Sequence, residues 1–260
     1  MAKNLIYQVA VGKPNPLYEI CIASVASYCQ RWGIEHRVQR EPILRIRPLH
    51  SFRSEGAVER LGYLPIFEKE NAFDFLDQFD AVCIVDSDIY VMPTAPDIFD
   101  QLGDAVFGAV AERDMPLTEQ HKKKIRKYSE GQYGPLRSEA DFRWNNLGAE
   151  FYNMGLMLCK NQLQSYLNAQ NSEQFIRRPE FERFVNGEGN WRWSTDQTLL
   201  NYWIKHDNVP TKNLDWRWNA LYRGIEDQYL SEAYFVHFFL AAHIPADKSI
   251  NQIITEICDS

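Results

Sequence analysis

The fold is decided by residues 81–88, which read Ala81-Val82-Cys83-Ile84-Val85-Asp86-Ser87-Asp88. The first five residues are all apolar, and a continuous apolar run of this length is typical of a central parallel strand covered on both faces. In open α/β sheets, ligands bind outside the carboxyl ends of such strands. The stretch therefore predicts an α/β domain whose functional site begins at Asp86.

Asp86 and Asp88 bring two carboxylates to this strand end. Both cannot point inward beside a dry core, because a buried unpaired charge is costly. A divalent cation would resolve this, since hard oxygen ligands suit Mg²⁺ or Mn²⁺, which also bind phosphate oxygens. The alternative is a strand-end turn with two solvated acids, and a bare D-x-D pattern is too common to decide between them.

The rest of the chain alternates strand and helix patterns. Residues 5–11 form a short apolar run rich in β-formers, and residues 34–38 could form a second strand. Between them, Asn15-Pro16 supplies an N-cap and a first helical residue, and Gly33 ends the helix. Strand, helix and strand in this order indicate an α/β domain. Three further helices are expected, over 65–79, from 196 and over 250–257. Three further strands are expected, over 105–111, 152–160 and 234–239. In residues 40–62 the apolar positions show no clear helix or strand period.

The composition is that of one globular domain over residues 1–260. Apolar residues make up 45% and charged residues 24%. A chain of this length buries roughly 70–75% of its unfolded surface, so it needs no disulfide bonds or structural metals to form a core. No stretch approaches the ~18 apolar residues of a membrane helix, and the apolar part of the start is too short for a signal peptide. The five cysteines are scattered and form no C-x-x-C pair. They indicate a reducing compartment, so we expect a cytoplasmic location.

The net charge of −7 bears on the choice of partner. Phosphate backbones require a basic surface, so this charge argues against nucleic acid as the main partner. A nucleotide ligand remains compatible with it, because a bound cation can neutralise the phosphates. The oligomeric state cannot be read from the sequence.

Residues 79–91 resemble the D-x-D strand of the metal-dependent GT-A glycosyltransferases, and more closely that of the glycogenin-like glycosyltransferase family 8. Later segments resemble further motifs of that family in the same order, and this joint order carries the resemblance over roughly residues 5–245. These segments are Phe151-Tyr152-Asn153-Met154-Gly155-Leu156-Met157-Leu158, Asp196-Gln197-Thr198-Leu199-Leu200-Asn201, Leu214-Asp215-Trp216-Arg217-Trp218-Asn219 and Val236-His237-Phe238.

The resemblance implies a GT-A α/β fold with a mixed, mostly parallel central sheet. Residues 1–111 would form the nucleotide-binding half and residues 112–260 the acceptor-side half. In that family the D-x-D aspartates and the histidine of the H-F strand hold Mn²⁺ on the diphosphate of the donor. The resemblance therefore assigns Asp86, Asp88 and His237 as ligands of Mn²⁺ or Mg²⁺. For His237 alone, the ordinary alternative is a hydrogen-bonded histidine at a strand end.

The resemblance also implies a nucleotide-sugar donor, expected to be a UDP-sugar. Val9, Ala10 and Val11 would hold the base, and Ser87 could reach the ribose. Lys69 matches a basic residue that contacts the donor, although a solvated helix charge is an equal alternative. The glycine and lysine that follow the family's H-F strand are absent, so either His243 substitutes as the diphosphate donor or this contact is missing.

Asp196, Gln197 and Asn153 are the residues that the resemblance places at the reacting sugar, in a reaction that retains the anomeric configuration. The alternatives are a capping box for Asp196 and Gln197, and a turn-prone polar residue for Asn153. Glu150 is a further candidate acceptor of sugar hydroxyl bonds. Asp196 or Glu150 could instead act as the base of an inverting enzyme.

Tryptophans are candidates for an acceptor cleft, because apolar sugar faces stack on aromatic rings. Core packing is the plainer interpretation for at least half of them. The candidates are Trp191, Trp193, Trp216 and Trp218. The acceptor itself would be a glycan or another hydroxyl compound.

Three rival functions remain open at this stage. A haloacid-dehalogenase-type phosphatase also uses D-x-D, but on its first strand and with a later acidic motif that this sequence lacks. A nucleotide-sugar pyrophosphorylase would need a glycine-rich loop after Val11. A carbohydrate-binding protein on an inactive GT-A scaffold would bind glycans without turnover, and metal-dependent release of nucleoside diphosphate would separate it from an enzyme.

Overall fold

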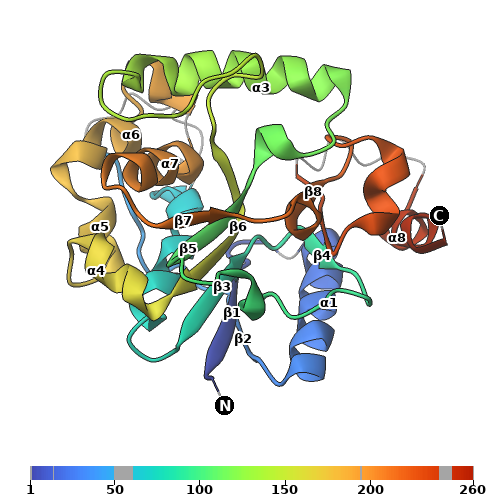
Figure 1. The fold of residues 1–260 in the computed structure, drawn as a ribbon. Helices are drawn as coiled ribbons and strands as arrows, with labels where there is room; N and C mark the ends of the chain where they lie inside the picture. The colour runs from blue at the N-terminus through green and yellow to red at the C-terminus, as the bar shows by residue number, and fades with distance from the viewer. Residues whose placement is uncertain (1, 14, 50–60, 194, 240–247, 260) are drawn as a thin grey trace.

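A computed structural model describes residues 2–13, 15–49, 61–193, 195–239 and 248–259. Its centre is a six-stranded sheet with the strand order β2-β1-β3-β6-β5-β7 (Figure 1). The strands are β1 (Asn4–Val9), β2 (Glu35–Gln39), β3 (Ala81–Val85), β5 (Phe107–Ala111), β6 (Tyr152–Lys160) and β7 (Thr211–Asn213). The strand β6 runs antiparallel to its neighbours β3 and β5, whereas the other pairings are parallel. The mixed, mostly parallel sheet expected from the sequence is confirmed.

The opening strand, helix and strand form as predicted. The helix α1 (Pro16–Trp32) is capped by the Asn15 side chain, which accepts from the backbone N–H of Leu17, and it ends at Gly33 with φ 66°. A positive φ of this kind favours glycine. The first strand ends at Val9, two residues before the predicted boundary, so Ala10 and Val11 lie in the loop at its carboxyl end.

The helix predicted over 65–79 is instead two tight turns, η1 (Pro65–Phe67) and η2 (Lys69–Phe75), both 3₁₀ helices. The physical reason is that this segment buries residues all round and not along one stripe, with Glu68, Glu70 and Asn71 among them. The Glu68 carboxylate accepts backbone N–H groups of Ile43, Leu44 and Arg45, which fixes the segment to the preceding loop.

A second, three-stranded sheet lies beside the first, with the order β4-β9-β8. Its strands are β4 (Ile89–Val91), β8 (Ala220–Leu221) and β9 (Phe235–His237), so the strand predicted over 234–239 is shorter than expected. The chain passes from β3 of the first sheet to β4 of the second through Asp86-Ser87-Asp88. This link is where the two sheets meet.

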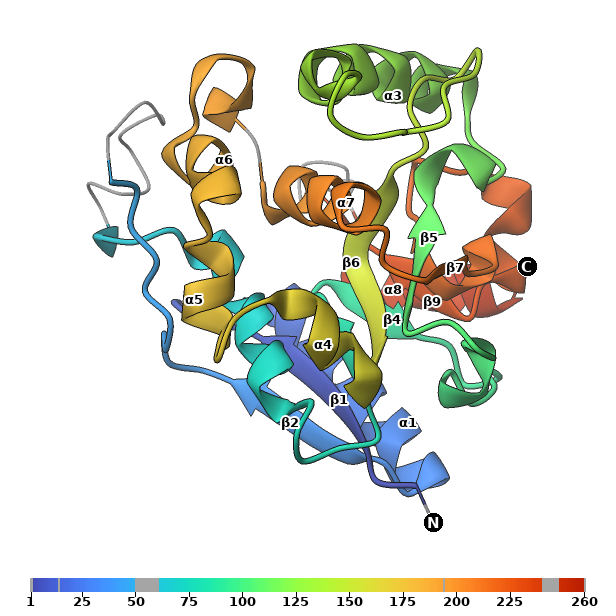
Figure 2. The same ribbon diagram turned by 60° about the vertical axis from the view of Figure 1, so that its left-hand side comes forward.

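Helices cover both faces of the large sheet. Figure 2 shows α4 (Gln164–Leu167), α5 (Ser172–Ile176), α6 (Glu182–Asn186) and α7 (Asp196–His206) on one side, with α1 on the other. The helix α3 (Glu119–Gln132) lies across the end of the sheet at the top of Figure 1, and α8 (Ile250–Asp259) closes the chain. Short 3₁₀ turns connect these elements: η3 (Phe99–Gln101), η4 (Glu112–Asp114), η5 (Gly134–Leu136), η6 (Asn161–Leu163), η7 (Pro179–Phe181), η8 (Gly189–Trp193), η9 (Trp216–Asn219) and η10 (Asp227–Glu232).

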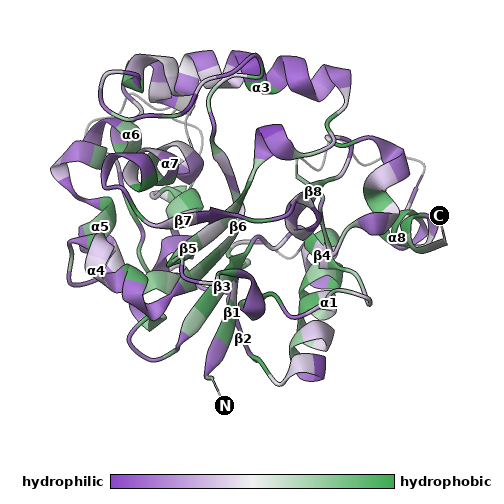
Figure 3. Cartoon of the chain, in the orientation of Figure 1, coloured by the Kyte–Doolittle hydropathy of each residue, from purple (hydrophilic) through white to green (hydrophobic). Residues whose placement is uncertain are grey.

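The central strands carry the apolar core. All five residues of β3 are buried, as the apolar run predicted, and Figure 3 shows the central strands as hydrophobic and α3 as mostly hydrophilic. Burying a Val or Ile side chain contributes roughly 1.5–3 kcal/mol, so this strand is a major source of stability. Among the described helices, none has the length and apolar character needed to span a membrane.

Candidate active site

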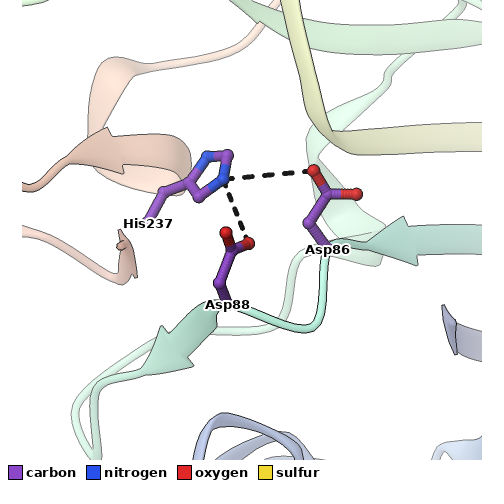
Figure 4. Close-up of side chains that lie close together, drawn as sticks. All are labelled: Asp86, Asp88 and His237. Atoms are coloured by element: carbon purple, nitrogen blue, oxygen red, sulfur yellow. Dashed lines mark ion pairs between the residues drawn. The ribbon is translucent and has the colours of Figure 1, made fainter. Parts of the chain in front are cut away.

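Three side chains from the two sheets converge at the link between β3 and β4. The Nε2 atom of His237 on β9 lies 3.2 Å from Oδ1 of Asp88 and 4.0 Å from Oδ2 of Asp86 (Figure 4). One ligand atom from each residue lies within 4.8 Å of the others. Two carboxylates and one imidazole form a donor set that suits Mn²⁺ or Mg²⁺, and they leave room in the coordination sphere for phosphate oxygens. The residues therefore fit the metal that the sequence predicted.

Gly155 on β6 makes room for the imidazole of His237. A Cβ atom at this position would lie 2.3 Å from Cε1 of His237 and 2.7 Å from its Nδ1. The backbone of Gly155 also fixes the link Asp86-Ser87-Asp88 between β3 and β4, since the Gly155 carbonyl accepts the N–H of Asp86 at 2.7 Å. We call this link the metal link. A glycine is needed here because the ring packs directly onto the strand.

Lys69 of η2 bridges two acids at this centre. Its Nζ atom lies 3.1 Å from Oδ1 of Asp86 and 2.8 Å from Oδ2 of Asp196, and it donates to the carbonyl of Met154 at 2.8 Å. The Lys69 side chain is only 12% exposed. The solvated-charge alternative for Lys69 is therefore wrong, and its ammonium ties the start of α7 to the metal link.

Burial and neighbouring charges shift the titration of the three candidate ligands. Burial raises the pKa of Asp86 to about 6, with Lys69 opposing the rise. Burial acts upward on Asp88 too, but His237, a backbone hydrogen bond and Lys69 together outweigh it and lower the pKa of Asp88. Burial alone would lower the pKa of His237, yet Asp88 and Asp86 together raise it. The two carboxylates thus favour a positive charge on His237, and a divalent cation meets the same electrostatic demand.

A cleft of about 730 Å³ opens over this centre. It lies at the carboxyl ends of the parallel strands β1, β3 and β5, where Ala10, Asp86 and Glu112 follow the strands. This is the place at which open α/β sheets bind ligands. The cleft brings together most of the residues singled out in the sequence: Val9, Ala10, Val11, Lys69, Asp86, Asp88, Asn153, Asp196, Gln197 and His237.

The start of α7 faces into the cleft. Thr195 caps the helix by accepting the N–H of Gln197. The Gln197 side chain accepts the N–H of Met154 at 3.2 Å and donates to the Tyr128 hydroxyl at 3.5 Å. The capping-box alternative is therefore wrong for the Gln197 side chain, which spans from β6 to α3.

Other predicted residues occupy different places. The Ser87 hydroxyl donates to the carbonyl of Val9, which fixes the end of β1 to the metal link. Glu150 pairs with Arg113 and Lys205 at 2.8 and 2.6 Å, and it does not line the described cleft. His243 lies outside the described residues.

The tryptophans do not line the described part of the cleft. Trp218 is 1% exposed and packs against Tyr234 and Phe235, so it belongs to the core and cannot offer a face to a sugar. Trp191 packs on Phe184 and donates its indole N–H to a backbone carbonyl at 3.0 Å. Trp216 is half-buried against Tyr229. The side chain of Trp193 lies outside the described part.

Glu112 and His121 are cleft residues that the sequence interpretation missed. The His121 Nε2 atom of α3 lies 2.7 Å from Oε1 of Glu112, and both side chains are buried. Glu112 directly follows the buried strand β5. The signal that identified Asp86, an acid at the end of an apolar strand, could therefore have identified Glu112 as well.

Comparison with known proteins identifies the fold. No family model and no curated protein matches the sequence. Among solved structures, the chain is similar to a glycosyltransferase involved in the glycosylation of the major capsid of PBCV-1, with TM-score 0.56, 14% identity and 98% of each chain covered.

Two further solved structures are similar over nearly the whole of this chain. The galactosyltransferase LgtC, in complex with donor and acceptor sugar analogs, matches with TM-score 0.51 and 16% identity, over 98% of this chain and 95% of that chain. The bifunctional glycosyltransferase WbbM matches with TM-score 0.52 and 11% identity, over 100% of this chain and 52% of that chain. The chain has the GT-A fold, and a haloacid-dehalogenase-type phosphatase is not favoured.

Proposed function

We propose that this protein is a metal-dependent hexosyltransferase. It transfers a hexose-type sugar from a nucleoside diphosphate donor, a UDP-sugar, to a hydroxyl group of a glycan or another acceptor, with retention of the anomeric configuration. The observation that carries this proposal is the cluster of Asp86, Asp88 and His237 within a large cleft at the carboxyl ends of the strands of a GT-A fold.

The donor is assigned to the part of the cleft around the ends of β1 and β3. Val9, Ala10 and Val11 line the cleft and would hold the base. Ser87, which bonds the carbonyl of Val9, would position this segment beside the diphosphate. Asp86, Asp88 and His237 would hold Mn²⁺ or Mg²⁺. A bound cation acts as a Lewis acid on the diphosphate as its negative charge develops.

The sugar is assigned to the start of α7. Asp196 is held in place by Lys69, so its carboxylate can accept sugar hydroxyl bonds while the pair remains charge-balanced. Gln197 reaches across the cleft between Met154 and Tyr128. In the transfer, the acceptor oxygen bonds to the anomeric carbon, and the bond from that carbon to the diphosphate oxygen breaks. The electron pair stays on the diphosphate, which takes up the proton of the acceptor hydroxyl.

Two assignments in this proposal extend beyond the cleft. Residues 1–111 would supply the nucleotide side and residues 112–260 the acceptor side, consistent with the cleft being lined from both. A cytoplasmic location remains part of the proposal. A glycan-binding protein without activity is the competing function, and it would not need a cation at Asp86, Asp88 and His237.

The test is release of UDP from a panel of UDP-hexoses with Mn²⁺ and a mixed panel of glycan acceptors. The variant Asp88→Asn should lower turnover at least ~100-fold, because it removes the negative charge of a ligand to a cation that contributes several kcal/mol. Asp104→Asn is the matched control, since Asp104 is exposed and lies outside the cleft, and it should retain full activity. No turnover by the wild-type protein with any donor, together with glycan binding, would refute the proposal.

A further inference from the structure

A chain of buried amides connects the candidate metal ligand His237 to the backbone of β6. Asn219 of η9 has its Oδ1 2.9 Å from Nδ1 of His237, and its Nδ2 2.9 Å from Oδ1 of Asn153. The same Asn153 oxygen accepts the backbone N–H of Gly155 at 3.0 Å. Asn219 is fully buried and Asn153 is 7% exposed, so water cannot replace these bonds freely.

The donor and the acceptor of every hydrogen bond in this series are fixed by its last member, the backbone N–H of Gly155. The backbone N–H of Gly155 can only donate, so the Asn153 atom facing it is the oxygen. That oxygen needs a donor from Asn219, so the Asn219 amide turns its NH₂ group to Asn153 and its oxygen to His237. The Nδ1 atom of His237 must therefore carry a hydrogen.

The other end of Asn153 gives the same orientation independently. Its Nδ2 atom lies 3.2 Å from Oε2 of Glu112, and a carboxylate oxygen of Glu112 accepts this hydrogen bond. Glu112 is itself held by His121 at 2.7 Å. Two separate anchors, a backbone N–H and a carboxylate, thus agree on how the Asn153 amide is turned.

We propose that Asn219 and Asn153 are positioning residues that hold His237 with its hydrogen on Nδ1, so that the lone pair on Nε2 is presented to a cation beside Asp86 and Asp88. The inference rests on the proposed metal site. A hydrogen bond to the far nitrogen of a ligating histidine fixes both the tautomer and the ring orientation. Here an amide relay supplies this hydrogen bond.

The relay also changes the expected role of Asn153. Its oxygen already accepts two hydrogen bonds, so both lone pairs of that oxygen are committed to protein partners. Its NH₂ group has two N–H donors, and the bond to Glu112 uses one of them. Asn153 lines the cleft, so a direct contact to a sugar hydroxyl would use the second N–H as a donor, and its oxygen would act through His237.

The first test measures Mn²⁺ binding in the absence of any donor, from the electron paramagnetic resonance signal of free Mn²⁺. The variant Asn219→Leu keeps the branched shape and the number of side-chain heavy atoms and removes both hydrogen bonds, so its Kd should rise 10–100-fold. Asn186→Leu is the control, because Asn186 is equally buried but lies outside the cleft, and its Kd should not change.

The outcomes separate this inference from the proposed function. If the wild type binds Mn²⁺ and Asn219→Leu binds it with the same Kd, the relay is wrong and the metal site stands. The same conclusion follows if Asn186→Leu loses as much Mn²⁺ affinity as Asn219→Leu. No Mn²⁺ binding by the wild type, with or without UDP, overturns the metal site and the relay together.

A second measurement needs no variant at position 219. Long-range ¹H–¹⁵N spectra of the histidine rings at pH 9, assigned with His237→Ala, identify which ring nitrogen carries hydrogen. We expect the hydrogen on Nδ1 of His237. An Nδ1 atom without a hydrogen would overturn the relay even if the Asn219→Leu protein fails to fold.

Discussion

At the scale of single residues, the candidate active site depends on the missing side chain of Gly155. The variant Gly155→Ala would place a Cβ atom 2.3 Å from the His237 ring, so the ring must move away from Asp86 and Asp88. We expect the Kd for Mn²⁺ to rise at least about tenfold, measured by isothermal titration calorimetry.

Gly131→Ala is the control for this substitution. Gly131 lies in α3, and a Cβ atom there would meet nothing within 4 Å. This variant should bind Mn²⁺ normally and gain up to about 1 kcal/mol of stability from helix propensity. Normal Mn²⁺ affinity in Gly155→Ala would contradict the packing argument.

Lys69 offers a second prediction at this scale. Replacing it with methionine leaves the carboxylates of Asp86 and Asp196 without their cation. Breaking a buried pair on one side is strongly destabilising, so the free energy of unfolding should fall by about 3 kcal/mol or more. Urea denaturation measures this fall. Lys3→Met, which removes an exposed lysine at the opposite end of the strands, should change stability little, and an equal effect would count against the Lys69 bridge.

At the scale of elements, the turn η2 contains a buried acid that the proposed reaction does not use. Both carboxylate oxygens of Glu70 are without a hydrogen-bond partner within the described part of the chain. Burial raises the pKa of Glu70 well above its usual value, Asp196 adds to the rise, and Lys69 opposes it. Burial thus favours the protonated form of Glu70, which Gln resembles in shape and charge.

The variant Glu70→Gln should therefore become more stable than wild type as the pH rises. A carboxyl with a raised pKa in the folded state contributes stability below its unfolded pKa, and this contribution is lost at higher pH. The difference in unfolding free energy should grow by up to about 1.4 kcal/mol per pH unit above the unfolded pKa of about 4.3. Urea denaturation of both proteins from pH 5 to 8 measures it, and a pH-independent difference would refute the burial of a neutral Glu70.

At the scale of the whole molecule, the candidate metal ligands come from both sheets. Asp86 and Asp88 lie on the link from the large sheet, whereas His237 lies on β9 of the small sheet. A cation bound by all three would stabilise the folded state by mass action, by about 2.7 kcal/mol at a concentration 100 times its Kd. For a chain of this size, we expect Tm to rise by roughly 5–10 °C.

Thermal unfolding with Mn²⁺, with Mn²⁺ and UDP, and with a chelator measures this effect. The chelator should reverse the rise in Tm, and His237→Ala should abolish it. A similar rise in Tm in His237→Ala would mean that Mn²⁺ binds elsewhere.

Local sequence patterns were enough to predict many of the elements and the chemistry of the strand end. The apolar run before Asp86, the cap at Asn15 and the stop at Gly33 depend on neighbouring residues, so their patterns predict structure directly. The ordered motifs supported the GT-A fold, which is confirmed. The acids at the ends of strands marked one edge of the sheet as a site.

Which side chains meet depends on long-range packing, which the sequence patterns do not reveal. The spacing of residues 65–79 could not show that buried polar groups on all sides favour two 3₁₀ turns over one amphipathic helix. Nor could it show that Trp218 is in the core while Glu112 and His121 line the cleft. The relay from Gly155 to His237 joins three segments far apart in the chain, and hydrogen bonds of this kind exist only once packing has excluded water and fixed each amide.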